Sequence, residues 1–208
     1  MNTHFNTSPD SPLEEWHNEV THASKLSSQS QPLMSSHPRL NEFFEGGLPW
    51  GHVCEWGSPW GSGGRELALS FLSSIGQSQP YWSLWIQSHS DVAFYPPAWQ
   101  ARGVDLDHLR FAETQEPLKD VKSVFLEPFF KVIVLDSAKL SRDDCAFLKR
   151  QAHKHKQAII LIKPYFLSPK QGNIWAKTRL NCWQDHVHQQ FHLQVVKGLS
   201  PRKIAISC

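Results

Sequence analysis

A glycine-rich segment between two apolar runs constrains the fold of this chain more than any other feature. The segment spans residues 58–65 and reads Ser-Pro-Trp-Gly-Ser-Gly-Gly-Arg. Residues 52–56 before it have the composition of a strand, and residues 66–78 after it place apolar side chains at helical spacing. Glycine tolerates backbone conformations that strain other residues, so the segment suits a sharp turn. The sequence therefore predicts a strand, a glycine-rich turn and a helix, in this order.

A phosphate loop occupies the same position in nucleotide-binding proteins and follows the pattern G-x-x-x-x-G-K-[S/T]. Its backbone N–H groups, lysine and hydroxyl hold the phosphates and Mg²⁺. Here Gly64 stands at the lysine position and Arg65 at the hydroxyl position. An inherited turn and a weak ATP or anion site both stay open, because N–H groups at a helix start attract anions. The candidate vestigial loop consists of Gly57, Ser58, Pro59, Gly61, Ser62, Gly63, Gly64 and Arg65.

The remaining pattern alternates between strands and helices. Strands are predicted at 81–86, 109–111, 131–136 and 158–162, and helices at 96–102, within 118–130 and at 141–155. Three more strands, at 180–183, 188–196 and 203–206, follow without helices between them. This order predicts an α/β fold, a mostly parallel twisted sheet with helices on both faces and antiparallel strands at its C-terminal edge.

Composition separates a polar N-terminal part from the rest of the chain. Residues 1–36 are rich in Ser, Gln, Asn, His and Pro and are predicted to be a disordered tail, and residues 37–208 the folded domain. No apolar run approaches membrane-spanning length, and the N-terminus lacks a secretory pattern. The four cysteines show no C-x-x-C spacing. We therefore expect a cytoplasmic protein with reduced thiols and no membrane span.

Charge is distributed unevenly along the chain. Residues 1–138 have a net charge of −8 and residues 139–208 a net charge of +10. Such a split suggests a basic face for DNA or for an acidic partner, unless both halves fold into one evenly charged surface. A tryptophan among these cations could stack on bases. The candidate contact residues are Lys170, Trp175, Lys177, Arg179, Lys197, Arg202 and Lys203.

No metal site is predicted. The histidines of the C-terminal half are His153, His155, His186, His188 and His192. They have no cysteine partners at the spacing of a zinc finger, so we expect surface or core positions for them.

The ordered elements resemble the RecA-type recombinase core over residues 37–208. Residues 46–56 look like the segment that this family places before its phosphate loop, residues 103–109 like its helix-to-strand turn, and residues 132–136 like its Walker B strand. The resemblance implies a RecA-like core in which Asp136 is the Walker B carboxylate. It also marks losses, since His89 replaces the glutamate that activates water and Pro164 the glutamine that senses the γ-phosphate. Together with Gly64 and Arg65, these losses predict no ATPase activity, no catalytic residue and no bound cofactor.

Residues 82–86, 95–99 and 103–106 resemble the ImuA and SulA-type proteins of bacterial DNA-damage responses. The resemblance implies a non-catalytic accessory protein of the SOS response and of translesion DNA synthesis. Its partners would be a translesion polymerase-type protein or RecA, with DNA as a further contact. Two alternatives stay open: a SulA-like inhibitor of cell division, and a nucleotide-binding ATPase with a rearranged site.

Overall fold

The computed structural model describes residues 31–75, 81–88, 94–170, 172–200 and 202–207 of the chain. Residues 1–31 and 32–208 form separate units, and the second contains the fold described below. Disorder was predicted for a tail of residues 1–36. Residues 1–30 of that tail lie outside the residues that the structure describes.

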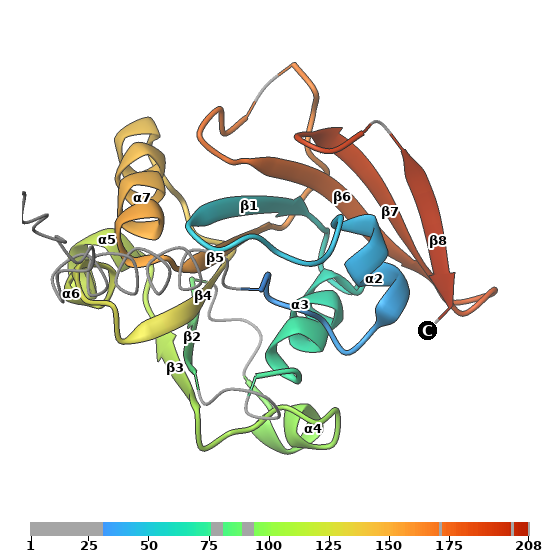
Figure 1. The fold of residues 1–208 in the computed structure, drawn as a ribbon, viewed down its shortest axis with the longest axis horizontal. Coiled ribbons are helices and arrows are strands. Elements are labelled where there is room, and N and C mark those ends of the chain that lie inside the picture. Colours follow the sequence, from blue (N-terminus) through green and yellow to red (C-terminus); the bar gives the residue numbers. More distant parts are fainter. Residues whose placement is uncertain (1–30, 76–80, 89–93, 171, 201, 208) are drawn as a thin grey trace, which may run out of the picture. The chain divides into compact units, whose positions relative to one another are not determined.

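Eight strands form one mixed sheet in the order β3-β2-β4-β5-β1-β6-β7-β8 (Figure 1). The strands are β1 (His52–Gly57), β2 (Trp82–Gln87), β3 (Leu109–Glu113), β4 (Phe130–Asp136), β5 (Ala158–Lys163), β6 (Thr178–Asp185), β7 (Gln190–Lys197) and β8 (Lys203–Ser207). The pairs from β3 through β6 are parallel, whereas β6 with β7 and β7 with β8 are antiparallel. The predicted α/β class, the mostly parallel sheet and the antiparallel C-terminal strands are confirmed.

The register brings the carboxyl ends of the central strands to one edge of the sheet. Gly57 at the end of β1 pairs with Lys163 at the end of β5. Asp136 at the end of β4 pairs with Ile162 of β5 and with Gln87 of β2. Ligands of open α/β sheets bind outside the carboxyl ends of the strands, so this edge is the first place to look for a site.

Helices cover both faces because the central strands are apolar on both sides. The helices are α2 (Pro38–Phe43), α3 (Gly64–Leu72), α4 (Pro96–Gln100), α5 (Pro117–Asp120), α6 (Ser123–Leu126) and α7 (Arg142–His155). One core cluster joins Leu67 and Phe71 of α3 to Cys54 and Trp56 of β1. The other joins α6 and α7 to the opposite faces of the strands. In Figure 1, α2 and α3 accordingly lie on one side of the central strands and α7 on the other.

Helix α7 begins as its sequence predicts. The Ser141 hydroxyl accepts a hydrogen bond from the Asp144 backbone N–H at 3.1 Å, and the Asp144 carboxylate accepts one from the Ser141 backbone N–H. This reciprocal capping box satisfies two N–H groups that lack partners within the helix. Lys156 ends the helix in the left-handed conformation, with φ 53°.

The start of the folded domain was predicted at residue 37, but the packed part of the chain begins a few residues earlier. Leu33 pairs with Leu48 as an isolated β-bridge and is 5% exposed. Ser35 is buried, and its backbone N–H donates to Asn41 Oδ1 at 2.7 Å. These contacts place residues 32–36 with the domain, although their polar composition suggested a tail. Among the described helices, none has both the length and the apolar character needed to cross a membrane.

Candidate functional site

The glycine-rich loop after β1 closes on itself through two serine side chains. Ser58 is fully buried, and its Oγ accepts a hydrogen bond from the Gly64 N–H at 3.0 Å. The same Oγ lies 2.9 Å from Ser62 Oγ, and the Ser62 hydroxyl donates to the Pro59 carbonyl at 2.6 Å. The backbone N–H groups of a phosphate loop bind anions only when they are free. Here the Gly64 N–H already bonds to a side chain of the loop itself.

The two glycines at the start of α3 leave no space for larger side chains. A Cβ on Gly64 would lie 2.3 Å from both Cβ and Oγ of Ser58, and 3.0 Å from Cys182 Sγ. Gly63 has a φ of +81°, and a Cβ there would lie 2.5 Å from a ring carbon of Phe191. A lysine at position 64, where a phosphate loop has one, would therefore not fit unless the loop moved.

Arg65 lies on the carboxylate that a phosphate-loop protein would use to hold Mg²⁺. Its Nε donates to Asp136 Oδ2 at 2.7 Å and its Nη2 to Asp136 Oδ1 at 2.6 Å. Ser137 contributes a third group, since its hydroxyl donates to Asp136 Oδ1 at 2.9 Å. The Asp136 side chain is 1% exposed and that of Arg65 is 19% exposed. Both oxygens of a buried carboxylate thus bind a two-pronged guanidinium, the strongest geometry for this pair.

Trp60 covers the other face of the guanidinium. The Arg65 Cζ lies 3.3 Å from the centroid of the Trp60 ring, within the range of a cation–π contact. Arg65 is held between an aromatic face and a carboxylate. A metal ion could reach Asp136 only after this arginine moved away.

The resemblance singled out two other positions, His89 and Pro164. His89 lies outside the described residues. Gln87, opposite Asp136 in the sheet, is buried. Pro164, directly after β5, has a side chain that neither donates nor accepts a hydrogen bond.

The structure corrects one of the predicted contact residues. Arg179 is 4% exposed, and its Nε donates to Glu55 Oε2 at 2.7 Å across β1 and β6. It also donates from Nη1 to the Ser168 carbonyl at 3.3 Å. A buried, paired guanidinium cannot lie on DNA, so Arg179 belongs to the interior. The sequence misled here because a positive charge does not indicate where its partner lies.

The other predicted cations are divided between separate places. Lys170 and Lys177 are exposed on the segment between β5 and β6. Lys197 donates to the Ile174 and Ala176 carbonyls at 2.7 and 3.0 Å, which anchors that segment to β7. Lys203 Nζ lies 4.9 Å from the centroid of the Trp183 ring.

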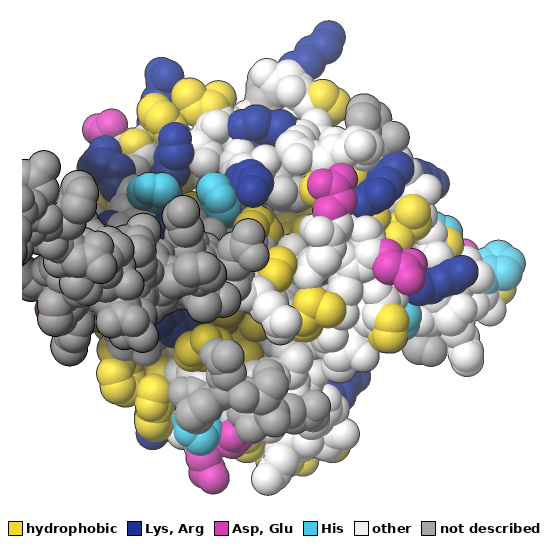
Figure 2. Space-filling view, viewed as in Figure 1, with side chains coloured by type: hydrophobic (Ala, Val, Ile, Leu, Met, Phe, Trp, Pro, Cys, Tyr) yellow, Lys and Arg dark blue, Asp and Glu magenta, His cyan; other side chains and the backbone are white. Residues whose placement is uncertain are grey.

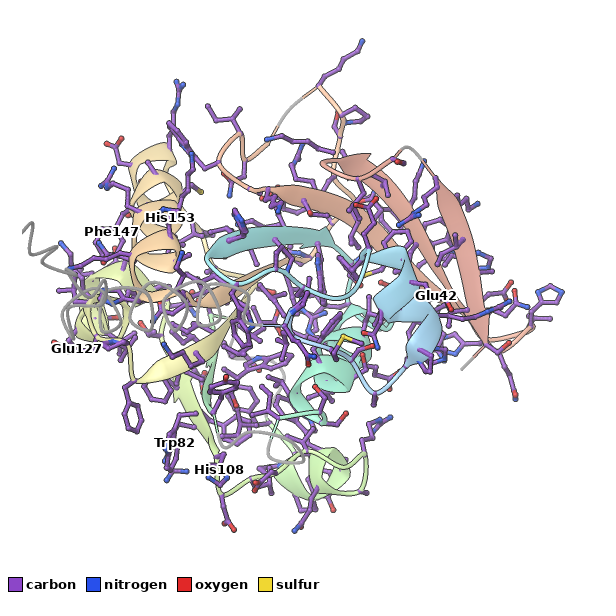
Figure 3. The ribbon with its side chains drawn as sticks, in the orientation of Figure 1. Glu42, Trp82, His108, Glu127, Phe147 and His153 are labelled. Carbon is purple, nitrogen blue, oxygen red and sulfur yellow. The ribbon has the colours of Figure 1, made fainter. Side chains whose placement is uncertain are left out.

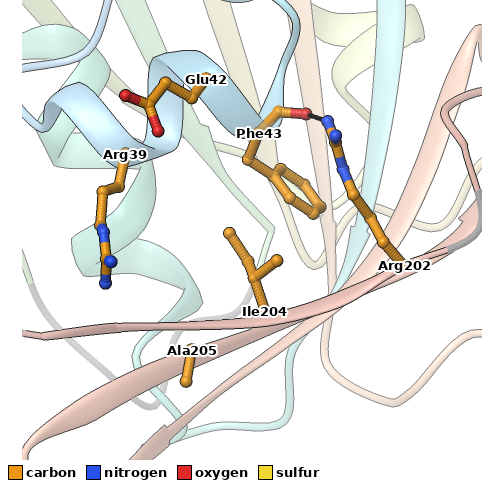
Figure 4. Close-up of a pocket in the computed structure, with 6 residues that line it drawn as sticks. All are labelled: Arg39, Glu42, Phe43, Arg202, Ile204 and Ala205. Atoms are coloured by element: carbon orange, nitrogen blue, oxygen red, sulfur yellow. Dashed lines mark hydrogen bonds between the residues drawn. The ribbon is translucent and has the colours of Figure 1, made fainter.

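Arg202 lines a pocket of about 310 Å³ between α2 and β8 (Figure 4). Its guanidinium lies over the Phe43 ring, 4.9 Å from the centroid, and donates to the Phe43 carbonyl. Figure 4 shows Arg39 and Glu42 on the same pocket. Arg202, directly before β8, thus connects this part of the chain to α2.

A basic patch lies where α7 ends beside the start of β1. We define the α7 basic patch as Lys149, His153, Lys156, His52 and Lys177. Gly51 approaches the backbone of α7 closely, since a Cβ on it would lie 3.6 Å from His153 Cα. Burial, and then the charges of the other four patch residues, lower the pKa of His52 below its ordinary value. Figure 2 shows Lys, Arg and His side chains gathered on this part of the surface. The patch presents positive charge to an anionic partner.

Sequence reasoning found only Lys177 of this patch. Lys149, His153 and Lys156 follow each other at helical spacing of four and three residues, which places them on one face of α7. That spacing could have indicated a basic helix face from the sequence. The proximity of His52 to these residues could not have been predicted, because it depends on how α7 packs on β1. Likewise, nothing in the local sequence indicates that Trp60 covers Arg65 or that Ser58 fills the loop.

Aromatic side chains gather at the amino end of β2. Trp82 and His108 lie side by side, with ring centroids 5.3 Å apart (Figure 3). Arg110 Cζ lies 4.3 Å above the Trp82 ring, and Phe129 stacks on it at 5.3 Å. Phe129 remains 55% exposed. This cluster offers a second surface with both cationic and aromatic character.

The histidines considered for zinc take other roles where the structure describes them. His188 Nδ1 lies 2.7 Å from Asp185 Oδ2, and His192 stacks on Trp183. The hydrogen bond from His188 is the largest cause that lowers the pKa of Asp185 to about 2. Within the described residues, no group of three or more His, Cys, Asp or Glu side chains has the arrangement of a metal site.

Comparison with known proteins adds no relative. A scan against protein-family models finds no match, and a search among curated proteins finds none either. The functional argument therefore depends on the geometry described above.

Proposed function

We propose that this protein is a RecA-like accessory factor without ATPase activity that acts by binding other macromolecules in the bacterial SOS response and translesion DNA synthesis. The observation that supports this most is the Arg65–Asp136 pair. It joins the start of α3 to the end of β4, the two places where the resemblance puts the phosphate-loop hydroxyl and the Walker B carboxylate.

The closed glycine-rich loop supports the part of the proposal that denies ATPase activity to this protein. Phosphoryl transfer requires a bound metal and charge neutralisation of the phosphates. The guanidinium takes the carboxylate, and Ser58 takes the Gly64 N–H. A site arranged in this way gains stability from internal contacts where an ATPase would bind its substrate.

The partner in this proposal is a translesion polymerase-type protein or RecA, with DNA as a further contact. The α7 basic patch supports an anionic partner surface, and four of its members protrude from α7 and from the segment before β6. The chemistry of the patch suits either phosphates or an acidic protein face.

The ATPase part is tested by steady-state hydrolysis of Mg-ATP and by calorimetry with Mg-ATP. We expect no turnover and no saturable heat. Turnover that Asp136→Ala abolishes would refute the proposal and favour the ATPase with a rearranged site.

The partner part is tested with purified RecA and a purified translesion polymerase-type protein in surface-binding measurements. Lys149→Glu and Lys177→Glu should each weaken the interaction, and Lys139→Glu, the same charge change at an exposed lysine outside the patch, should not. If neither protein binds, and overproduction instead produces filamentous cells with capture of the division protein, the cell-division inhibitor is the correct reading.

A further inference from the structure

A cavity of about 500 Å³ lies between the first turns of α7 and the segment that links β5 to β6. It is on the face of the sheet opposite α3, since its floor is formed by Glu55 of β1 and Lys163 of β5. Its size lies within the range of small-molecule sites. The function proposed above does not use this cavity.

Two N–H donors on the cavity wall lack partners among the described residues. Asn173 is 9% exposed, and its Oδ1 accepts a hydrogen bond from the Trp175 backbone N–H at 2.9 Å. Its Nδ2 is buried without a hydrogen-bond partner, and so is the indole Nε1 of Trp175. Buried donors are nearly always satisfied, and leaving one unpaired is costly. An acceptor bound in the cavity would give both donors the partner that they lack.

The charges that face the cavity favour an anion. Lys163 donates one proton to the Ala138 carbonyl at 2.8 Å, which leaves two others, and burial lowers the pKa of this lysine. Arg142 lies on the rim, and Lys149 approaches the Trp175 ring at 5.3 Å. The acidic group on the lining, Glu55, is neutralised by its ion pair with Arg179. Asp144 of the first helical turn is engaged by Ser141 in the capping box.

The remaining wall is apolar and aromatic. Leu140, Cys145 and the rings of Tyr165 and Trp175 line it together with Ile174. Tyr165 and Ile174 are 55% and 57% exposed, so they form an open mouth. Burial raises the pKa of the Cys145 thiol, which keeps it neutral. The cavity thus combines two free N–H donors and a cation with a hydrophobic rim.

We propose that this cavity is a binding site for a small organic anion, in which a carboxylate or phosphate group on an apolar body binds to Asn173, Trp175 and Lys163. The oxyanion accepts hydrogen bonds from Asn173 Nδ2 and Trp175 Nε1. The apolar body lies against Tyr165 and Ile174.

Four probes separate the two parts of the ligand. Phenylacetate and phenyl phosphate combine an aromatic ring with the two oxyanions, benzyl alcohol has the ring without charge, and inorganic phosphate has charge without the ring. Nitrogen–proton correlation spectra of the full chain record the indole N–H of Trp175, which the Trp175→Phe variant assigns. We expect saturable shifts of that resonance with phenylacetate or phenyl phosphate, with the tighter probe identifying the oxyanion. Benzyl alcohol and inorganic phosphate should bind at least about tenfold more weakly.

Variants then test the donors, with binding of the better probe measured by calorimetry because Trp175→Phe removes the indole resonance. Trp175→Phe keeps an aromatic ring and removes the N–H, so it should weaken binding of the better probe about tenfold, the effect of one hydrogen bond to a charged group. Lys163→Met should do the same and provides a second test if the first variant folds poorly. Trp82→Phe, at the amino end of β2 and outside the cavity lining, is the matched control. No shift with any probe, equal binding of benzyl alcohol, or unchanged affinity in both variants would overturn the proposal.

Discussion

Replacing Arg65 by alanine should destabilise the fold far more than the loss of an ordinary surface arginine. With Arg65 in place the Asp136 side chain is 1% exposed, and the substitution removes the guanidinium from a carboxylate whose other side-chain bond among the described residues comes from the Ser137 hydroxyl. Breaking a buried ion pair by removing one partner costs about 3–5 kcal/mol. The remaining hydroxyl bond and the 19% exposure of Arg65 place our expectation near the lower end, at about 3 kcal/mol.

Asp136→Asn tests the same pair from the other side. Asparagine retains the shape and one acceptor, and water reaches the arginine left behind, so about 1–2 kcal/mol should be lost. The double variant should be less destabilised than the sum of the two single variants. We expect a coupling energy of about 2 kcal/mol, because each single change already removes the shared interaction.

The assay is urea denaturation followed by circular dichroism, with the slope m checked for constancy. Arg102→Ala is the matched control, since Arg102 pairs with Glu66 at a similar distance but both side chains are exposed. Its loss should be below about 1 kcal/mol. If Arg65→Ala costs no more than Arg102→Ala, or if the coupling energy is below about 0.5 kcal/mol, the pair does not hold the loop as described.

Three further predictions concern single positions. Gly64→Lys should fail to restore ATP binding and should lower the melting temperature, because its Cβ would overlap the Ser58 side chain; calorimetry and thermal denaturation measure both. His52 has a lowered pKa in the folded protein, so the unfolded chain binds the proton more readily and stability falls as the pH drops through about 6.5. His52→Gln should flatten the pH dependence of the urea midpoint relative to the unmodified protein. The thiols of Cys54 and Cys182, whose pKa burial raises to about 12, should react with iodoacetamide only after unfolding, as mass spectrometry of the labelled peptides reports.

Each of these has a contrary result. Saturable ATP binding by Gly64→Lys would mean that the loop opens easily. An unchanged pH profile in His52→Gln would assign the pH dependence to other groups. Rapid labelling of either cysteine at neutral pH would show that the core around it opens often.

Much of the α/β framework could be predicted from local patterns. The apolar runs at 131–136 and 158–162 are buried parallel strands, as their composition indicated. Helix α7 begins after Ser141, where the cap residue stands in the sequence. The helix predicted within 118–130 is present as α6, and a second short helix, α5, precedes it and begins at Pro117. Helix ends are the least predictable part, because a few hydrogen bonds decide them.

The candidate site was predictable only in part. The missing lysine and the buried Asp136 are visible in the sequence, but their relation to Arg65 is not. A side chain's charge predicts which kind of partner it needs and gives no information on where that partner lies. Arg179 illustrates this. It was expected on a contact surface, and in the structure it forms an interior ion pair with Glu55.

Local chemistry alone set the order of strands and helices, the glycine turn after β1 and the absence of a lysine within it, because periodicity and backbone preference act between near neighbours. Only the packed sheet decided that Arg65 reaches a carboxylate 71 residues away, that Ser58 fills its own loop and that Asn173 and Trp175 line a cavity. Those contacts join residues distant in sequence, and their energies exist only after burial has removed water from both partners.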